Sequence, residues 1–316
     1  MASPFPRVYE SPTELVGRTP LLRLGRLFPD ATVLGKLEFF NPSASIKDRT
    51  ALSIVRAAEA DGRLKAGGTI LEATSGNTGI AFAWIGAALG YKVIVCMPDD
   101  VSHERRALLR ALGAELVLTP GKAAMAGANQ EAGRILERTP GAFLSGQGGN
   151  PANPHVHFTT TGPEIWEDTG GQVDVLVSTV GTGGTITGVG SYLRSKNPTL
   201  KIYAVEPAEA PVLSGGEFSP HKIQGIIGGN GFPPVLDTGL YDEVISVPSD
   251  VAIDTARELM RVERLLAGVS AGANIAATRI VAARPEHQGQ TIVTFLCDTG
   301  ERYVSSALFD HVRETL

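Results

Sequence analysis

The sequence Asn-Pro-Ser-Ala-Ser-Ile-Lys-Asp-Arg at residues 41–49 joins a predicted strand to a predicted helix. Proline fixes its own φ and restricts the residue before it, so the Asn-Pro pair ends the extended run over residues 33–40. Apolar residues then recur at the helical spacing i, i+3, i+4 and i+7, at Ala51, Ile54, Val55 and Ala58. Lys47 therefore falls in the first turn of a helix, where the free N–H groups and the helix dipole disfavour a cation.

Two interpretations of Lys47 are open at this point. If the side chain is also desolvated, the helix end favours its neutral amine, which can form a Schiff base with a carbonyl group. Alternatively, residues 47–49 are the solvated, charged start of a surface helix and need no special role. The remaining motifs of the chain have to decide between the two.

Composition and charge are those of an ordinary globular protein, and they exclude several classes of function. The chain has 316 residues, enough for one large or two medium domains, and a formal net charge of −5. This charge provides no basic field for nucleic acid or for an anionic membrane surface. No segment approaches the roughly 18 apolar residues of a membrane span. Residues 1–10 lack the apolar region of a secretory signal.

The cysteines and one histidine pair are the candidates for a redox or metal site. Cys96 and Cys297 lie in apolar runs without a CxxC pattern, which predicts buried thiols and a protein of the reducing cytoplasm. His155 and His157 have the spacing HxH but lack further ligands at a suitable spacing, so we predict no metal site.

Strand and helix patterns alternate along most of the chain. Strands are predicted at residues 33–39, 69–72, 92–97, 114–119, 142–145, 173–180, 201–206 and 291–297. Helices are predicted at residues 47–60, 80–89, 102–112, 126–138, 159–168, 186–196, 250–264 and 271–283. This alternation predicts an α/β fold built on parallel sheets.

A segment rich in Gly, Asn and Pro at residues 147–154 interrupts the alternation and predicts a crossing between two domains. We expect a smaller, mobile α/β domain at residues 45–149. A larger α/β domain is expected from residues 13–44 together with 150–316. Residues 1–12 are expected to form an N-terminal arm.

Three polar or glycine-rich turns each precede a predicted helix. Thr-Ser-Gly-Asn-Thr-Gly at 74–79 gathers hydroxyls, an amide and free N–H groups, which suits a carboxylate or phosphate, although a capped turn would also contain one Ser or Thr. Gly-Thr-Gly-Gly-Thr at 181–185 has Ile186 in place of the third glycine of a dinucleotide fingerprint. It suits a single phosphate monoester or is simply a tight turn. Ser270, in Gly-Val-Ser-Ala-Gly-Ala at 268–273, is explained by N-capping alone.

Taken together, eight motifs occur in an order typical of one family. They are the motifs at 41–49, 74–79, 181–185 and 268–273, Asn-Pro-Ala-Asn-Pro at 150–154, Thr-Thr-Gly-Pro-Glu-Ile-Trp at 160–166, His-Lys-Ile-Gln-Gly-Ile at 221–226 and Asp-Thr-Gly-Glu-Arg-Tyr at 298–303. The chain resembles the cysteine synthase (O-acetylserine sulfhydrylase) family of pyridoxal-phosphate enzymes, which share the fold of the tryptophan synthase β-subunit. The resemblance covers almost the whole chain and implies fold type II, with two three-layer parallel-sheet domains.

The resemblance also assigns a role to each matching residue. It implies that Lys47 holds pyridoxal phosphate as a Schiff base and moves the substrate α-proton. Asn77 is expected at the ring oxygen of the cofactor and Ser270 at its pyridine nitrogen. The phosphate is expected to bind Gly181, Thr182, Gly183, Gly184 and Thr185. The substrate is expected to bind Thr74, Ser75, Gly76, Thr78, Gln147 and Gly225.

The activity implied by the resemblance is a β-replacement that makes L-cysteine from O-acetyl-L-serine and sulfide. Acetate is released by way of an α-aminoacrylate intermediate. The resemblance further implies a cytoplasmic homodimer and allows a complex with serine acetyltransferase. No nucleic acid or membrane partner is expected.

Two departures from the family leave the substrate open. Gly148 stands where the family usually has an aromatic residue, and residues 224–232 are two residues longer than the family's loop. The alternatives are an O-phosphoserine sulfhydrylase, a cystathionine β-synthase or a diaminopropionate-type synthase. From other classes, a dehydrogenase is disfavoured by the failed glycine fingerprint, and a catalytically silent homologue by the presence of Lys47.

Overall fold

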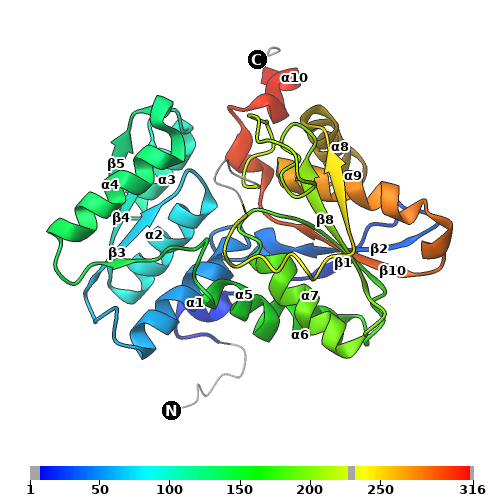
Figure 1. The fold of residues 1–316 in the computed structure, drawn as a ribbon, viewed down its shortest axis with the longest axis horizontal. Helices are drawn as coiled ribbons and strands as arrows, with labels where there is room; N and C mark the ends of the chain where they lie inside the picture. The colour runs from blue at the N-terminus through cyan, green and yellow to red at the C-terminus, as the bar shows by residue number, and fades with distance from the viewer. Residues whose placement is uncertain (1–7, 227–231, 314–316) are drawn as a thin grey trace. The chain divides into compact units, whose positions relative to one another are not determined.

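The computed structural model describes residues 8–226 and 232–313. The chain forms two compact units, each with its own sheet (Figure 1). The first unit consists of Met1–Gly17 and Asn41–Ala152, and the second of Arg18–Phe40 and Asn153–Leu316. The predicted α/β class with parallel sheets is confirmed.

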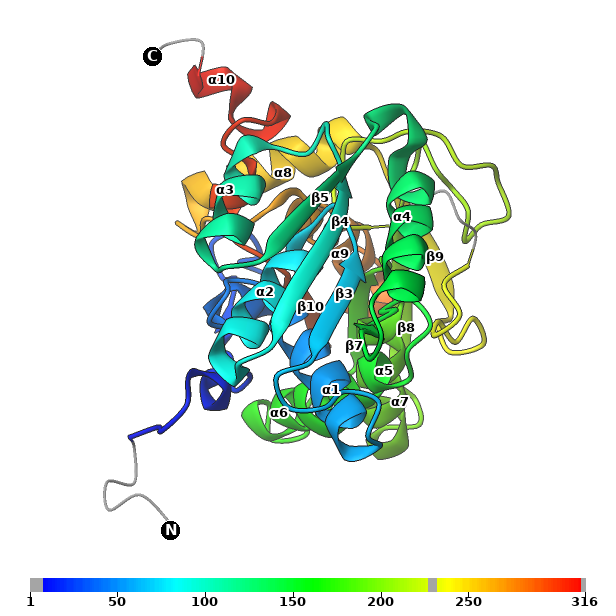
Figure 2. The ribbon, with the colours of Figure 1, turned by 90° about the vertical axis from the view of Figure 1, so that its left-hand side faces the viewer.

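The first unit is built on a four-stranded, wholly parallel sheet with the order β5-β4-β3-β6. Its strands are β3 (Thr69–Ala73), β4 (Lys92–Pro98), β5 (Glu115–Thr119) and β6 (Phe143–Leu144). Its helices are α1 (Lys47–Ala60), α2 (Asn77–Leu89), α3 (His103–Ala111) and α4 (Ala124–Arg138). Figure 2 shows α2 and α3 on one side of this sheet and α4 on the other. The face beneath α4 is a small buried cluster of Leu71, Cys96, Ala128 and Ala132.

The second unit is built on a six-stranded sheet with the order β1-β2-β10-β7-β8-β9. Its strands are β1 (Leu21–Arg23), β2 (Thr32–Leu37), β7 (Val175–Thr179), β8 (Lys201–Pro207), β9 (Glu243–Val247) and β10 (Thr291–Leu296). Its main helices are α6 (Gly162–Asp168), α7 (Gly184–Lys196), α8 (Ser249–Val262) and α9 (Val269–Ala282). In Figure 1, α8 and α9 lie on one side of this sheet and α6 and α7 on the other, giving three layers.

Short helices complete the structure. Two of them are α5 (Ala152–Val156) and α10 (Asp310–Arg313), and a five-residue π-helix spans His157–Thr161. The 3₁₀ helices are Pro12–Leu15, Glu38–Phe40, Gly121–Ala123, Pro285–His287, Gly300–Tyr303 and Ala307–Phe309.

The structure divides the chain differently from the sequence-based boundaries. Residues 13–17 and 41–44 belong to the first unit, whereas we had expected both in the larger domain. The Gly17 N–H donates to Asn41 Oδ1 at 2.9 Å, and the 3₁₀ helix Pro12–Leu15 contacts α2. These contacts hold the two segments to the first unit. Part of the expected arm, residues 1–7, lies outside the described residues.

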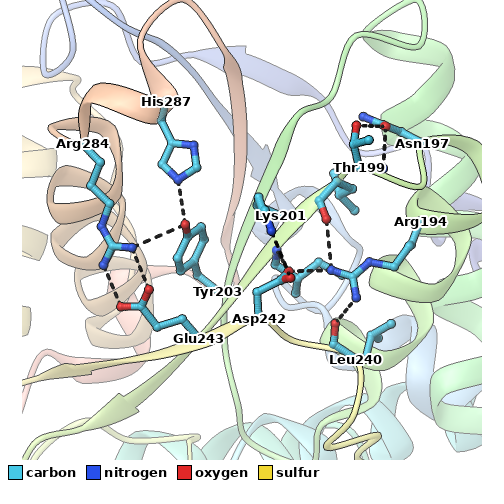
Figure 3. A network of polar contacts seen from close by, with 12 residues as sticks. Arg194, Asn197, Thr199, Lys201, Tyr203, Leu240, Asp242, Glu243, Arg284 and His287 are labelled. Atoms are coloured by element: carbon cyan, nitrogen blue, oxygen red, sulfur yellow. Dashed lines mark hydrogen bonds and ion pairs between the residues drawn. The ribbon is translucent and has the colours of Figure 1, made fainter.

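The strands β1 and β9 were not predicted, and β1 pairs with β2 in the antiparallel direction. The start of β9 is held by side chains from distant elements (Figure 3). Arg284 donates to both carboxylate oxygens of Glu243, each at 2.7 Å. One residue earlier, Arg194 donates to Asp242 at 2.5 Å. The position of β9 therefore depends on tertiary ion pairs that its own five residues do not indicate.

Cys96 and Cys297 differ in burial. Cys96 lies in β4 and is fully buried, as predicted, and burial raises the pKa of its thiol to about 11. Cys297 follows the carboxyl end of β10 and is only partly buried, so the prediction of a buried thiol is wrong for it. Among the described residues, no helix has the length and apolar character needed to cross a membrane.

Lys36, in β2, is a fully buried cation within the second unit. Its ammonium group donates to the Thr19 carbonyl at 2.6 Å and lies 3.0 Å from a carboxylate oxygen of Glu164. It also lies 3.3 Å from Asp168. Since Glu164 and Asp168 are both in α6, the interaction fixes that helix to the sheet.

Replacing Lys36 with methionine is expected to lower the free energy of unfolding by about 3–5 kcal/mol, because it removes the cation of a buried ion pair with Glu164. Urea unfolding of the two proteins measures the difference. The control is Lys201→Met, since Lys201 is 54% exposed at its side chain and pairs with Asp242 at 3.5 Å. That change should cost less than about 1 kcal/mol, and equal losses in the two variants would contradict the prediction.

Candidate active site

Lys47 is the first residue of α1, as predicted, and its side chain is half-buried. Its N–H donates to Ser45 Oγ at 3.2 Å. The preceding turn is tightly made, since Ala44 has φ of 60° and its N–H donates to the Asn41 carbonyl at 2.8 Å. A left-handed backbone at a non-glycine residue is strained and is kept where the surrounding contacts enforce it.

Asp48 and Arg49, which follow Lys47, are buried, with exposed fractions of 0% and 1%. The Asp48 carboxylate accepts a hydrogen bond from the Ser43 N–H at 2.6 Å and another from the Ser43 hydroxyl. The interpretation of residues 47–49 as a solvated helix start is therefore wrong. The Asp48 carboxylate stabilises the turn through its hydrogen bonds with Ser43. This turn holds Lys47 at a defined position at the helix N-terminus.

The Thr-Ser-Gly-Asn-Thr-Gly turn at 74–79 connects the carboxyl end of β3 to α2. Asn77 is the first residue of α2, and the N-cap is Gly76, which offers no side chain to cap the helix. The capped-turn alternative is therefore wrong, and the N-terminus of this 13-residue helix suits an anion. Thr74 Oγ1 accepts from the Gly76 N–H at 3.2 Å, while Ser75 is exposed.

Gln147 follows β6 and reaches the same turn. Thr78 Oγ1 donates to Gln147 Oε1 at 2.8 Å, so two of the predicted substrate residues are in direct contact. The carboxyl ends of parallel strands are where open α/β sheets bind ligands. A Cβ built on the neighbouring Gly148 would meet no atom within 4 Å, so there is room where the family usually has an aromatic residue.

Glu72, the fourth residue of β3, was missed by the sequence analysis. It is 2% exposed, accepts from Gln147 Nε2 at 3.2 Å and is hydrogen-bonded to the Ser145 hydroxyl. Burial raises the pKa of the Glu72 carboxyl to about 8, and the hydrogen bond from Gln147 opposes this only in part. An acidic residue in an otherwise apolar strand, directly before the 74–79 turn, was the signal that could have found it.

The stability of the protein should depend on pH through Glu72. In the unfolded chain the Glu72 carboxyl has a pKa near 4.5, whereas in the folded state its pKa is about 8. Between these two pH values the folded state therefore binds more protons than the unfolded state. Glu72 therefore contributes a decrease in unfolding free energy of about 1.4 kcal/mol per pH unit as pH rises through this window. Unfolding of the wild type and Glu72→Gln from pH 5 to 8 measures it. The variant should lack this contribution, and parallel curves would rule it out.

The Gly-Thr-Gly-Gly-Thr loop at 181–185 lies in the second unit, between β7 and α7. A Cβ at Gly181 would lie 2.5 Å from the Gly225 carbonyl oxygen, and one at Gly184 would overlap the Asn153 side chain. Gly183, the N-cap of α7, has φ of 83° and supplies no capping side chain. These close approaches require glycine and leave the N-terminus of a 13-residue helix to bind an anion.

The two hydroxyls of this loop are fixed by neighbouring side chains. Asn153 Nδ2 donates to Thr182 Oγ1 at 2.9 Å. Thr185 Oγ1 lies 3.4 Å from His157 Nε2, and His157 Nδ1 lies 2.9 Å from Thr161 Oγ1. One histidine of the HxH pair thus supports the loop. A helix N-terminus flanked by two fixed hydroxyls suits one phosphate group.

Ser270 is the second residue of α9 and is 5% exposed. The N-cap of α9 is Gly268, so the explanation of Ser270 as an N-cap is wrong. Asn274, one turn later on the same face, accepts from the Thr179 N–H at 2.7 Å, just before the 181–185 loop. Within residues 8–226 and 232–313, the Ser270 hydroxyl makes no hydrogen bond to another side chain or carbonyl. It is therefore a buried polar group able to bind a ligand.

The predicted site residues are divided between the two units. Lys47, residues 74–78 and Gln147 belong to the first unit. Residues 181–185, Gly225 and Ser270 belong to the second, where Gly225 has φ of 86°. The part of the longer loop at residues 227–231 lies outside the described residues.

Comparison with known proteins gives the family. The family model described as pyridoxal-phosphate dependent enzyme matches residues 12–298. A cysteine synthase of Staphylococcus aureus is 48% identical over 301 residues, which cover 94% of this chain and 96% of the relative. The crystal structure of a cysteine synthase from Entamoeba histolytica has a TM-score of 0.92 and 44% identity, covering 98% of this chain and 93% of that one.

A second solved structure carries a different name. An O-ureido-L-serine synthase is 45% identical, with a TM-score of 0.93, and the match covers 96% of each chain. The chain belongs to the family of pyridoxal-phosphate dependent enzymes.

Proposed function

We propose that this chain is a cysteine synthase, which makes L-cysteine from O-acetyl-L-serine and sulfide and releases acetate. The observation that carries the proposal is the match to a curated cysteine synthase along nearly the whole chain. The O-acetylserine sulfhydrylase of Entamoeba histolytica among the solved structures supports the choice of donor.

The residues of this structure fit pyridoxal phosphate. The glycines at 181, 183 and 184 exclude side chains from a loop that opens α7, so a single phosphate can approach the backbone. Ser270 offers a hydroxyl suited to the pyridine nitrogen, and Asn77 would bind the ring oxygen. Lys47 would hold the aldehyde carbon. When bound, the cofactor supplies a ring that stabilises negative charge at the substrate α-carbon.

In this proposal, Lys47 Nζ removes the proton from the substrate α-carbon and returns it once sulfide has added at the β-carbon. Its place in the first turn of α1 disfavours the charged form and so helps it to act as a base. A neutral Ser270 hydroxyl fixes no proton on the ring nitrogen as a carboxylate would, which suits elimination better than transamination. The substrate would bind Thr74, Ser75, Gly76, Thr78, Gln147 and Gly225, with its carboxylate at Thr74, Ser75, Thr78 and Gln147.

The test is to supply the holoenzyme with O-acetyl-L-serine and sulfide and to measure L-cysteine and acetate. We expect both products in equal amounts. Cofactor-loaded protein that forms no cysteine from this pair would refute the proposal.

A second candidate is a β-replacement enzyme with another donor or nucleophile, including O-phosphoserine, cystathionine or diaminopropionate chemistry. Two observations favour it: the open space at Gly148 and the similarity to a protein named O-ureido-L-serine synthase. Comparing kcat/KM for sulfide with bulkier thiols and amines, and for O-acetylserine with O-phosphoserine, separates the candidates. A larger kcat/KM with any alternative pair would favour the second.

We also propose that the enzyme is a cytoplasmic homodimer that can bind serine acetyltransferase. The family resemblance supports this assembly, and the buried Cys96 thiol agrees with a reducing compartment. Analytical ultracentrifugation with and without serine acetyltransferase tests it. A monomer that does not bind the acetyltransferase would contradict both parts.

A further inference from the structure

We propose that Glu72, acting as a neutral acid, is a positioning residue that orients Gln147 for the carboxylate of the amino-acid substrate. The inference rests on the proposed function for the role of Gln147. Glu72 lies outside the 74–79 motif, in the strand β3 that precedes this motif.

The geometry links Glu72 to the substrate turn through one side chain. Gln147 uses both ends of its amide: its Nε2 donates to Glu72 Oε1 at 3.2 Å, and its Oε1 accepts from Thr78 Oγ1 at 2.8 Å. Because Glu72 accepts from the NH₂ end, the amide oxygen is turned toward Thr78. Glu72 therefore determines the orientation of the Gln147 amide. The amide oxygen in turn fixes the Thr78 hydroxyl that donates to it.

Ser145 indicates which form of Glu72 is present. Its hydroxyl lies within hydrogen-bonding distance of Glu72 Oε2 and of the Leu71 carbonyl oxygen, which is at 3.3 Å. A hydroxyl has one hydrogen, so it cannot donate to two acceptors at once. All these contacts are satisfied if Ser145 donates to Leu71 and protonated Glu72 donates to Ser145.

The surroundings agree with a neutral Glu72. Among residues 8–226 and 232–313, no cation forms an ion pair with it. Burial alone raises its pKa, to about 8, so it is neutral at pH 7. Above that value it would place a negative charge beside the proposed carboxylate site, and amino-acid binding should weaken.

The other titratable side chains near Glu72 come from the elements packed against β3. The elements packed against β3 are β4, β6, α2 and α4. Neither α2 nor β6 carries a titratable side chain. In β4, the Cys96 thiol has a pKa of about 11, and Lys92 is at the opposite end of the strand. α4, on the other face, carries Glu131, Arg134, Glu137 and Arg138.

The experiment measures binding of L-serine, which has the carboxylate in question and requires no turnover. Wild type, Glu72→Gln and Glu72→Leu are loaded with pyridoxal phosphate and titrated at pH 6.5 and 9.0, with the visible absorption of the cofactor as the readout. Glutamine imitates the neutral acid, whereas leucine removes both hydrogen bonds. Comparing proteins at one pH cancels the ionisation of the L-serine amine.

At pH 6.5 we expect Glu72→Gln to bind L-serine within about twofold of wild type, and Glu72→Leu about 10- to 100-fold more weakly. At pH 9.0 only about a tenth of wild-type Glu72 stays neutral, so wild type should bind about tenfold more weakly than Glu72→Gln.

Equal pH profiles of wild type and Glu72→Gln would overturn the inference, even if Glu72→Leu fails to fold. So would wild-type binding by Glu72→Leu, or a wild type that does not respond to L-serine. A wild type that binds L-serine as expected but makes no cysteine would refute the proposed function alone.

Discussion

Replacing Lys47 with alanine should abolish cysteine formation and leave the fold intact. In the proposed mechanism Lys47 both holds the cofactor and moves the α-proton, so one substitution removes two functions. We expect kcat to fall by about 10⁴-fold or more and the visible absorption of the bound cofactor to be lost. The helix should persist because alanine has the highest helix propensity and Asp48 still closes the turn through Ser43.

The matched control is Lys65→Ala, which removes an exposed lysine from the same unit. It should keep wild-type activity and absorption. Circular dichroism and unfolding of the two variants separate loss of chemistry from loss of structure. A Lys47→Ala protein that still turns over O-acetylserine would refute the role assigned to Lys47.

Replacing Gly184 with alanine should strongly weaken cofactor binding. The new Cβ would overlap the side chain of Asn153, whose Nδ2 donates to Thr182 Oγ1 at 2.9 Å. Asn153 must move, and the loop that would hold the phosphate moves with it. Overpacking of this kind costs about 1–3 kcal/mol, so the dissociation constant of pyridoxal phosphate should rise about 10- to 100-fold.

Gly133→Ala is the control for that variant. Gly133 lies inside α4, and a Cβ there would meet nothing within 4 Å, so alanine should leave cofactor affinity unchanged and slightly stabilise the helix. Equilibrium dialysis of pyridoxal phosphate against the two proteins gives the comparison. Unchanged affinity in Gly184→Ala would show that the loop does not hold the phosphate.

The elements that the sequence predicted well are those with strong periodicity and clear stops. α1 runs from Lys47 to Ala60, as its apolar spacing indicated, because Pro42 and the turn after it fix where the helix begins. The β9 strand had no such signal. Its residues became a strand because Glu243 and Asp242 are paired with arginines far away in the sequence.

The parts of the candidate site that consist of sequence motifs were predictable. The residues whose role depends on burial were not. The turn at 74–79 and the loop at 181–185 were visible as local patterns. Asp48 and Arg49 looked like surface charges, since nothing in the sequence shows that Ser43 encloses Asp48. Glu72 was missed for the same reason, because its partners Ser145 and Gln147 lie more than 70 residues further along the chain.

The most direct test of the account is to reduce the holoenzyme with borohydride, digest it and locate the modified lysine by mass spectrometry. Reduction should trap the pyridoxyl phosphate group covalently on Lys47 and on no other lysine. Label on any other lysine, or none on a protein that holds the cofactor, would contradict the account.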